Sequence, residues 1–225
     1  MTHLYVFGDS IAQGAWDPFG GWVQRVRTIL DQTFFDDPDK ECLTFNMGVS
    51  GNTSDDILKR FQKEMKARVF SDEKNMIIFA MGINDSLVFQ ETGLAQISVS
   101  DFESNLTKLY KKAKKYSDRI CFVGLNPVHE KLVNPLPWAP EKSYWNSSIQ
   151  QYNEIIKGFC AEENIKFIDI WQDWINESYH DWLFDGIHPN AAGHQRIAGA
   201  VLSRFLKPAG WFIPDEDEEG YIRLK

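Results

Sequence analysis

The stretch HLYVFGDS at residues 3–10 sets the expected architecture of this chain. Its first five residues form a largely apolar run, which predicts a buried strand. The following Gly8-Asp9-Ser10 ends that strand, and residues 11–14 predict a turn and the beginning of a helix. A serine at a strand-to-helix turn stands clear of the sheet, and its backbone N–H points toward the space before the helix, where negative charge is favoured. Ser10 is therefore a candidate nucleophile, and the alternative is an ordinary turn with an Asp-Ser cap.

Beyond this stretch, short apolar runs alternate with segments of helical periodicity. The further strands are expected at residues 42–47, 76–81, 120–125 and 165–170. Amphipathic helix patterns fall between them and after the last one. Alternating units of this kind predict an α/β fold, a three-layer α/β/α sandwich around a mostly parallel five-stranded sheet. In such sheets ligands bind beyond the carboxyl ends of the strands, so chemistry is expected directly after each strand.

Three helix starts are predicted from capping patterns. Thr53 is followed by acidic residues in the first turn of a helix, as an N-cap residue often is. Ser100 and Glu103 have the spacing of a capping box. Pro189 is expected at the first position of the last helix, where its missing N–H does no harm. The first and the third of these starts directly follow polar turns at the expected ligand-binding edge.

The turns after the strands carry the residue types that acyl transfer needs. Ser10 requires a base to act as a nucleophile near neutral pH, and His188 is the natural choice because the ordinary pKa of histidine is about 6.5. A histidine base needs a partner that holds its tautomer, and Asp185 lies three residues before it in a turn ended by proline. The backbone N–H groups of Ser10 and Gly51, with the side-chain amide of Asn84, would supply three donors for an oxyanion.

These turns resemble the four sequence blocks of the SGNH (GDSL-type) hydrolases, a family of serine esterases and lipases with a flavodoxin-like sheet. The matching segments are GDS at residues 8–10, GVSGNT at 48–53, GIND at 82–85 and DGIH at 185–188. The resemblance extends from Gly8 to the last helix. It departs from the family at Ile11, where GDSL has leucine, and this position does not touch the chemistry. Each block is weak by itself, but four in order make a specific pattern.

The resemblance implies the SGNH hydrolase fold and a role for each matching residue. The implied catalytic residues are Ser10, Asp185 and His188. The implied oxyanion-hole residues are Ser10, Gly51 and Asn84. Gly48 is the alternative to Gly51 in the second block. Neither a metal nor an organic cofactor is implied.

The implied activity is hydrolysis of a carboxylic ester through an acyl-enzyme intermediate. The substrate would be a small or lipid-like molecule, and lysophospholipids and acetylated sugars both fit this family. An acyl-CoA thioesterase with the same machinery is one alternative. A non-catalytic ligand-binding module on the same fold is another, although such a module has no reason to keep serine, glycine, asparagine, aspartate and histidine together.

The composition fits one large domain. The chain has 225 residues, of which 43% are apolar, and the domain is expected over residues 1–213. Residues 214–225 include the run DEDEE and are expected to form a solvated acidic tail. The net charge of −8 argues against nucleic acid or an anionic membrane surface as the main partner. The oligomeric state is not visible in the sequence, and a homodimer stays open.

The sequence also bears on the cellular compartment. No stretch approaches the about 20 apolar residues of a membrane-spanning helix. The first expected strand begins so close to Met1 that a signal peptide does not fit before it. Cys42, Cys121 and Cys160 lie in apolar or helical settings without metal-type spacing, which favours reduced thiols. We therefore expect a cytoplasmic protein without stable membrane insertion.

Other histidines have simpler interpretations. His194 shares a helical face with apolar residues and is expected to be a hydrogen-bonded core residue. His129 lies in a proline-rich segment, where surface exposure is expected. A metal site made of His180, Asp185 and His188 is a minor alternative, because no further ligand cluster accompanies these residues.

Three tryptophans are candidate walls of a substrate pocket. Trp16 closely follows the GDS turn, Trp138 lies in the proline-rich segment, and Trp182 is close in sequence to the DGIH block. The proline-rich segment, residues 126–142, follows the fourth expected strand on the catalytic edge. We therefore expect this segment to cover the pocket and to shape its preference for substrates.

Overall fold

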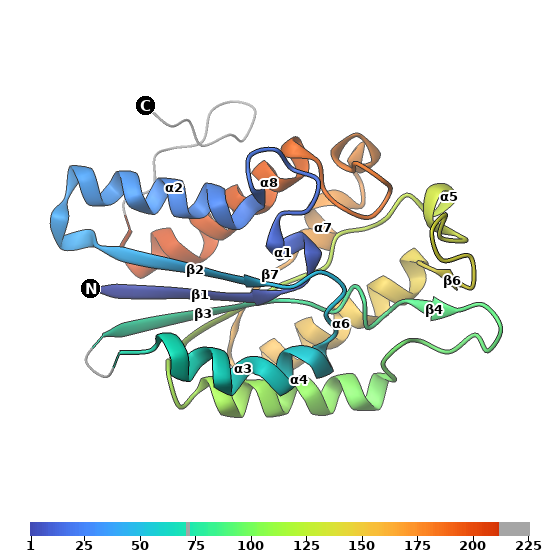
Figure 1. Ribbon diagram of the computed structural model, residues 1–225, viewed down its shortest axis with the longest axis horizontal. Coiled ribbons are helices and arrows are strands. Elements are labelled where there is room, and N and C mark those ends of the chain that lie inside the picture. Colours follow the sequence, from blue (N-terminus) through green and yellow to red (C-terminus); the bar gives the residue numbers. More distant parts are fainter. Residues whose placement is uncertain (71–72, 212–225) are drawn as a thin grey trace.

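The structure, a computed structural model, describes residues 1–70 and 73–211 (Figure 1). At its centre is a sheet of five parallel strands in the spatial order β2-β1-β3-β5-β7. These strands are β1 (Thr2–Gly8), β2 (Cys42–Gly48), β3 (Lys74–Ala80), β5 (Arg119–Val123) and β7 (Lys166–Ile168). The order is that of a flavodoxin-like, doubly wound sheet, whose ligand-binding switch point lies between β1 and β3. The predicted α/β class and the predicted sheet are confirmed.

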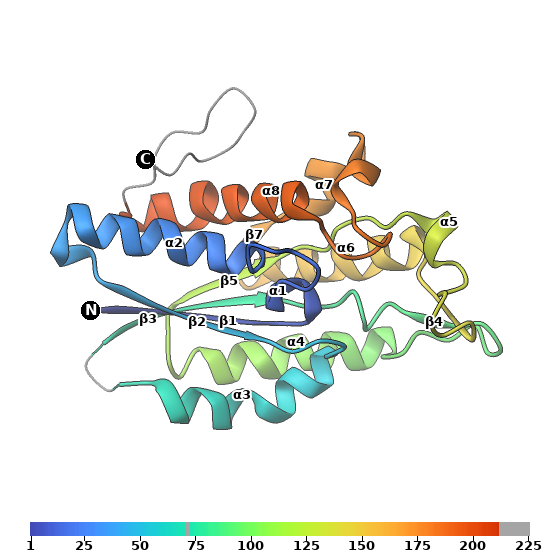
Figure 2. The same ribbon diagram turned by 45° about the horizontal axis from the view of Figure 1, so that its top comes forward.

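Helices cover both faces of this sheet, which gives the expected three layers (Figures 1 and 2). One face carries α2 (Gly21–Asp36) and α8 (Ala191–Val201), which pack against each other. The other carries α3 (Ser54–Arg68) and α4 (Val99–Ala113), and α6 (Asn146–Glu162) packs against α4 and β7. Two short helices, α1 (Ser10–Gln13) and α7 (Ile170–Trp174), lie close to the carboxyl ends of the strands, and a third, α5 (Glu130–Val133), lies farther out on the same side.

The two central strands explain why the sheet sits inside the molecule. Leu4 to Phe7 in β1 and Met76 to Phe79 in β3 are fully buried, because each strand has helices on both sides. Their side chains pack against the helix layers. The ring of Phe7, for example, packs against that of Phe61 in α3 with centroids 4.8 Å apart. Burial of one such side chain stabilises the fold by roughly 1.5–3 kcal/mol. The continuous apolar runs of the sequence therefore predict the central strands well.

The helix starts agree with the sequence only in part. Thr53 caps α3 in a full capping box with Asp56, as its sequence context predicts. The prediction that Ser100 caps a helix is wrong, because Ser98 caps α4 and accepts a hydrogen bond from the N–H of Asp101. Both serines have an acidic residue three positions later, so the local pattern is ambiguous. Tertiary contacts decide: the N–H of Ile97, just before the cap, is bound to the carbonyl of Asp85.

The bounds of α8 and β7 also differ from the expected ones. Pro189 does not start the last helix, because it lies in a bridge with Leu183, and α8 starts after the N-cap Asn190. The Asn190 side chain accepts hydrogen bonds from the N–H groups of Ala192 and Gly193. Strand β7 stops at Ile168, because the next residue already caps α7.

The segment 126–142 has more structure than expected. It contains α5, and its last residue belongs to β6 (Lys142–Ser143), which pairs antiparallel with β4 (Val88–Phe89). This small second sheet lies beyond the carboxyl ends of the large one, at the far edge of the molecule (Figure 1). The segment is therefore a structured element rather than an irregular loop.

The expected acidic tail, residues 214–225, lies outside the described residues, so the division of the chain at residue 213 stays a prediction. Cys42, Cys121 and Cys160 are buried free thiols, as expected. Across residues 1–70 and 73–211, none of the helices combines the length and the apolar character that crossing a bilayer requires.

Candidate active site

The turn after β1 places Ser10 at the carboxyl edge of the sheet. Gly8 ends the strand where a Cβ would lie 2.4 Å from the Ala12 side chain and 2.5 Å from the Ala80 carbonyl oxygen, so only glycine fits there. Asp9 then caps α1 by accepting a hydrogen bond of 2.9 Å from the N–H of Ile11. Ser10 is the first residue of α1, and only 5% of its surface is exposed. The tight turn therefore fixes the position of its hydroxyl group.

The three residues predicted as a catalytic triad meet at this edge. The hydroxyl of Ser10 lies 2.9 Å from Nε2 of His188, although 178 positions separate the two in sequence. On the other side of the imidazole, Nδ1 lies 2.7 Å from Oδ2 of Asp185. The second carboxylate oxygen of Asp185 accepts hydrogen bonds from the backbone N–H groups of Ile187 and His188. One side chain thus shapes the turn and orients the imidazole.

The electrostatics of Asp185 suit this arrangement. Partial burial raises the pKa of its carboxyl group, but hydrogen bonds from His188 and the charge of that ring outweigh burial and leave the pKa below its ordinary value. Asp185 is therefore ionised near neutral pH. An ionised carboxylate at Nδ1 keeps the proton on that nitrogen, so Nε2 is free to accept a proton from Ser10.

The predicted oxyanion donors differ in whether their N–H groups are already bound. Within the described part of the chain, neither the N–H of Ser10 nor that of Gly51 is paired with an acceptor. Gly51 has a φ of 78°, which favours glycine, and an added Cβ would meet nothing within 4 Å. The N–H of Gly48 is bound to the side chain of Asn46 at 2.9 Å, so the alternative donor of the second block is occupied. The geometry thus favours Gly51 over Gly48.

The third predicted donor, Asn84, is held by two neighbours. Its Nδ2 donates to the carbonyl of Asn52 at 3.0 Å, which ties the third block to the second. Its Oδ1 accepts a hydrogen bond of 2.8 Å from the hydroxyl of Tyr144. The amide nitrogen of Asn carries two hydrogens, so one remains for a ligand. Nothing in the sequence motif points to Tyr144, which lies 60 positions away.

Two further side chains, the buried Asp85 and the partly buried Arg60, support these turns, and sequence reasoning missed both roles. Asp85 accepts hydrogen bonds from the N–H and hydroxyl of Ser54 at the start of α3, and burial raises its pKa to about 7. Arg60 of α3 donates to the Asn52 side chain at 2.8 Å and to the Met47 carbonyl at 2.7 Å. The contacts of Asp85 and Arg60 hold the second block in place, because the residues they bind lie on both sides of Gly51 in sequence.

Of the three tryptophans predicted as pocket walls, Trp16 lies beside the candidate base. Its ring meets the ring of His188 edge to face with centroids 6.4 Å apart. It also stacks on Phe184 at 6.2 Å, and both rings are more than half exposed, at 61% and 64%. Phe184, which sequence reasoning missed, precedes the DGIH block by one residue. An exposed aromatic pair thus flanks the candidate base.

The other two tryptophans lie differently. The ring of Trp182 packs on Trp174 at 5.2 Å and under the guanidinium of Arg196 at 3.9 Å, so its contacts are with α7 and α8. Its closeness to Asp185 in sequence does not bring its ring to Ser10. Trp138 is 59% exposed in the segment 126–142, between two residues that form a small bridge.

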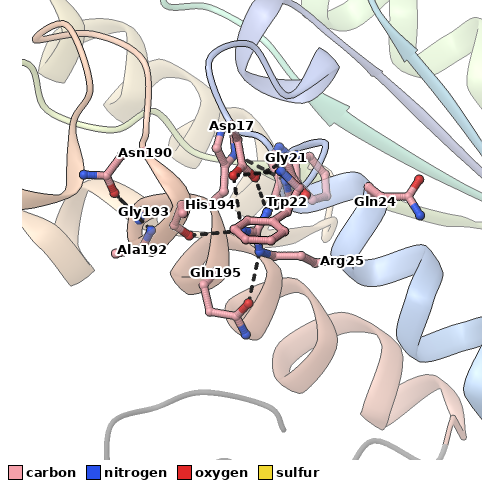
Figure 3. A network of polar contacts seen from close by, with 12 residues as sticks. Asp17, Gly21, Trp22, Gln24, Arg25, Asn190, Ala192, Gly193, His194 and Gln195 are labelled. Atoms are coloured by element: carbon pink, nitrogen blue, oxygen red, sulfur yellow. Dashed lines mark hydrogen bonds and ion pairs between the residues drawn. The ribbon is translucent and has the colours of Figure 1, made fainter. Parts of the chain in front are cut away.

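A buried ion pair holds the turn that carries Trp16 (Figure 3). Asp17 is paired with Arg25 of α2 and accepts the N–H of Gly21 at 2.9 Å. Arg25 in turn donates to the side chain of Gln195 on α8 at 3.1 Å. The turn is therefore fastened to both helices of that face. Since α8 follows directly after His188, the network relates the position of Trp16 to that of the base.

His194 lies in the same network and fulfils its predicted role. It is fully buried, and its Nδ1 accepts a hydrogen bond of 3.2 Å from the backbone N–H of Trp22 (Figure 3). Burial lowers its pKa to about 4, so the ring is neutral at pH 7. The prediction of a hydrogen-bonded core histidine is confirmed.

The segment 126–142 packs against the turn that carries Asp185 and His188. The N–H of His129 donates to the carbonyl of Gly186 at 2.8 Å, and a Cβ on Gly186 would lie 2.9 Å from Leu132. His129 is half-buried rather than exposed, because its ring stacks on that of His180 at 4.1 Å. His180 is one of the two histidines of the alternative metal set. Among the described residues, no three histidine, cysteine or acidic side chains cluster as metal ligands would.

Comparisons with curated proteins link the chain to esterases. It is 27% identical over 165 residues to a GDSL esterase/lipase of Arabidopsis thaliana, a match that covers 68% of this chain. The chain spans about half of that relative, since the match covers 51% of it. It is 24% identical over 218 residues to an acetylxylan esterase of Geobacillus stearothermophilus, with 88% of this chain and 91% of the relative covered.

Solved structures share the fold. A variant of an acetyl xylan esterase from Geobacillus stearothermophilus has a TM-score of 0.69 at 22% identity, covering 96% of this chain and 97% of its own. A lipolytic protein of the G-D-S-L family from Veillonella parvula has a TM-score of 0.68 at 21% identity, covering 92% and 100%. These likenesses confirm the SGNH hydrolase fold.

A family match agrees with the motifs in the sequence. The model of the GDSL-like Lipase/Acylhydrolase family matches residues 6–196, which include all four blocks and most of the described structure. The resemblance seen in the sequence is thereby confirmed. The chain belongs to the GDSL-like lipase/acylhydrolase family.

Proposed function

We propose that this protein is a serine esterase that cleaves a carboxylic ester through an acyl-enzyme intermediate. The observation that carries the proposal is the unbroken line of hydrogen bonds from the hydroxyl of Ser10 through His188 to Asp185. A nucleophile, a base and an orienting carboxylate in that order form the arrangement of a catalytic triad for acyl transfer. Family membership supports the same conclusion.

In the first half-reaction, Nε2 of His188 takes the proton of Ser10 while the hydroxyl oxygen attacks the ester carbonyl. The carbonyl oxygen becomes an oxyanion, and the N–H groups of Ser10 and Gly51 and the amide of Asn84 stabilise it. His188 then gives its proton to the leaving alcohol as the carbon–oxygen bond breaks. In the second half-reaction, water replaces the alcohol, and the same proton transfers release the acid and restore Ser10.

Among ester substrates, acetylated sugars are the class we favour. The match between this chain and the acetylxylan esterase extends over most of the length of both proteins. The exposed rings of Trp16 and Phe184 lie beside His188, where they offer a flat apolar surface. Sugar rings have apolar faces that pack on such aromatic surfaces, whereas a long acyl chain requires a deep apolar channel. Lysophospholipids and acyl-CoA thioesters are the competing substrates in the test.

The test of the reaction type is Ser10→Ala, assayed with p-nitrophenyl acetate. We expect a loss of at least about 10³-fold in kcat/KM, because the nucleophile acts as a unit with its base. Ser50→Ala is the matched control, since Ser50 is an exposed serine at the same edge and should leave the activity unchanged. Most of the activity surviving in Ser10→Ala, or no labelling of Ser10 by a fluorophosphonate, would contradict the proposal.

The test of the substrate class is a panel of acetylated xylo-oligosaccharides, p-nitrophenyl esters of increasing acyl length, lysophosphatidylcholine and acetyl-CoA. We expect acetyl esters to be cleaved with higher kcat/KM than esters with eight or more acyl carbons. A maximum at long acyl chains would favour a lipase, and faster cleavage of acetyl-CoA than of every oxygen ester would favour a thioesterase.

A further inference from the structure

Tyr144 is a buried residue at the boundary between the small sheet and α6. Only 4% of its surface is exposed, and it directly follows β6. Its backbone N–H donates to the carbonyl of Val133 at 3.1 Å. Its side chain reaches the third block of the site, where the hydroxyl donates to Oδ1 of Asn84 at 2.8 Å. A residue outside all four blocks thus touches a proposed oxyanion donor.

This hydrogen bond bears on the orientation of the Asn84 amide. A carboxamide can turn by 180°, which exchanges a donor for an acceptor, and only the donor stabilises an oxyanion. The hydroxyl of Tyr144 can donate to Oδ1, whereas Nδ2 at that place would leave the phenol hydrogen without an acceptor. At the other end, the carbonyl of Asn52 accepts from Nδ2 at 3.0 Å and would repel an oxygen. The two contacts select the same orientation.

The phenol remains a donor over the working pH range. Burial raises the pKa of Tyr144 above its ordinary value, and the nearby carboxylates of Asp9, Asp185 and Asp85 raise it further. The neutral hydroxyl therefore keeps its hydrogen wherever a histidine base is active. The carbonyl of Asn52 supplies the second constraint on the amide. It belongs to a turn that Arg60 holds by donating a hydrogen bond to the Asn52 side chain.

We propose that Tyr144 is a positioning residue that sets the orientation of the Asn84 carboxamide so that its N–H faces the oxyanion. The proposal rests on the proposed esterase function. It also assigns a role to the segment 126–142, because the backbone of Tyr144 is bound to Val133 and the hydroxyl of Ser143 is bound to Asn134 at 2.8 Å. The segment that packs against the base turn therefore also supports the oxyanion donor.

The experiment compares Tyr144→Phe with the full-length wild type. Phenylalanine keeps the buried ring and removes only the hydroxyl. We expect kcat for p-nitrophenyl acetate to fall about tenfold or more, with KM changed by less than about threefold, because the lost interaction acts in the transition state. The rate of phosphonylation of Ser10 by a fluorophosphonate should fall in parallel, because the phosphonyl oxygen occupies the same donors.

A double-mutant cycle separates positioning from a structural role. In an Asn84→Ala background the amide is gone, so adding Tyr144→Phe should lower kcat by less than about twofold. Tyr5→Phe is the matched control, since it also removes a buried hydroxyl, one that donates to the carbonyl of Arg68. We expect this control to leave kcat unchanged.

The outcomes are distinct. Unchanged kcat in Tyr144→Phe, or equal losses from Tyr144→Phe with and without Asn84, would overturn the positioning role. So would a fall in kcat that merely follows a fall in the folded fraction, as read by circular dichroism. Failure of the esterase function itself would appear differently, as full activity in Ser10→Ala.

Discussion

Two histidines six residues apart, His188 in the turn before α8 and His194 inside it, have opposite surroundings. His188 is bound to Asp185 on one ring nitrogen and to Ser10 on the other, and part of its ring is exposed. His194 is fully buried, and Nδ1 accepts a hydrogen bond from the backbone N–H of Trp22. One imidazole is arranged to exchange protons, and the other to remain neutral.

The comparison shows that the hydrogen-bond partners of a histidine decide whether it can act as a base. A carboxylate at Nδ1 stabilises the imidazolium that forms when Nε2 takes a proton. A backbone N–H at Nδ1 does the reverse, since it needs the lone pair that protonation would remove. Burial adds to this effect by disfavouring the charged ring, which is why the pKa of His194 falls to about 4.

The largest expected effect separates the two histidines by activity. His188→Ala should lower kcat for p-nitrophenyl acetate by at least about 10³-fold, because the base and the nucleophile act together. The variant should remain folded, because the Asp185 side chain keeps its hydrogen bonds from the backbone N–H groups of residues 187 and 188. His194→Leu should retain kcat within about threefold but lower the free energy of unfolding by about 1–3 kcal/mol, because the N–H of Trp22 loses its acceptor. Similar losses of kcat in both variants would break the distinction.

The second effect separates them by the pH dependence of stability. An unfolded chain protonates His194 below a pKa of about 6.5, whereas the folded site holds it neutral down to about 4. Between these values the unfolded state binds the extra proton, so the free energy of unfolding should decrease as the pH falls, by on the order of 3 kcal/mol from this group.

The measurement is urea unfolding of the wild type and His194→Leu at pH 7.5 and pH 4.5. The difference between the two proteins isolates this group from others that titrate in the same window, such as His3, whose pKa burial also lowers. We expect the wild type to lose more stability than the variant on acidification. Equal losses would mean that His194 titrates normally in the folded protein.

The smallest effect concerns the aromatic surface beside His188. Trp16→Ala removes a ring that meets the base and stacks on Phe184. We expect KM for an acetylated xylo-oligosaccharide to rise up to about tenfold, since an aromatic contact contributes about 0.5–1.5 kcal/mol. We expect kcat for p-nitrophenyl acetate to stay within about threefold. Trp138→Ala serves as the control. An equal rise in KM in this control would mean that Trp16 has no specific role in substrate binding.

Much of the candidate site could be predicted because its blocks are local in sequence. Ser10, Gly51, Asn84 and the Asp185–His188 pair each follow an element that hydrophobic periodicity predicts, and parallel strands bring such turns to one edge. Prediction failed where two local patterns were equal, as for Ser98 and Ser100. The sequence also did not show that the ring of Trp182 packs on Trp174 and Arg196, because closeness along the chain does not say which way a ring points.

The sequence by itself determined the order of strands and helices, the family, and the residue types present at the catalytic edge. Tertiary structure alone decided that Gly51 rather than Gly48 has a free N–H, that Tyr144 reaches Asn84, and that burial lowers the pKa of His194. The physical reason is range. Periodicity and capping act over a few residues, whereas a hydrogen bond or a pKa depends on the distance and burial of partners that folding brings from far along the chain.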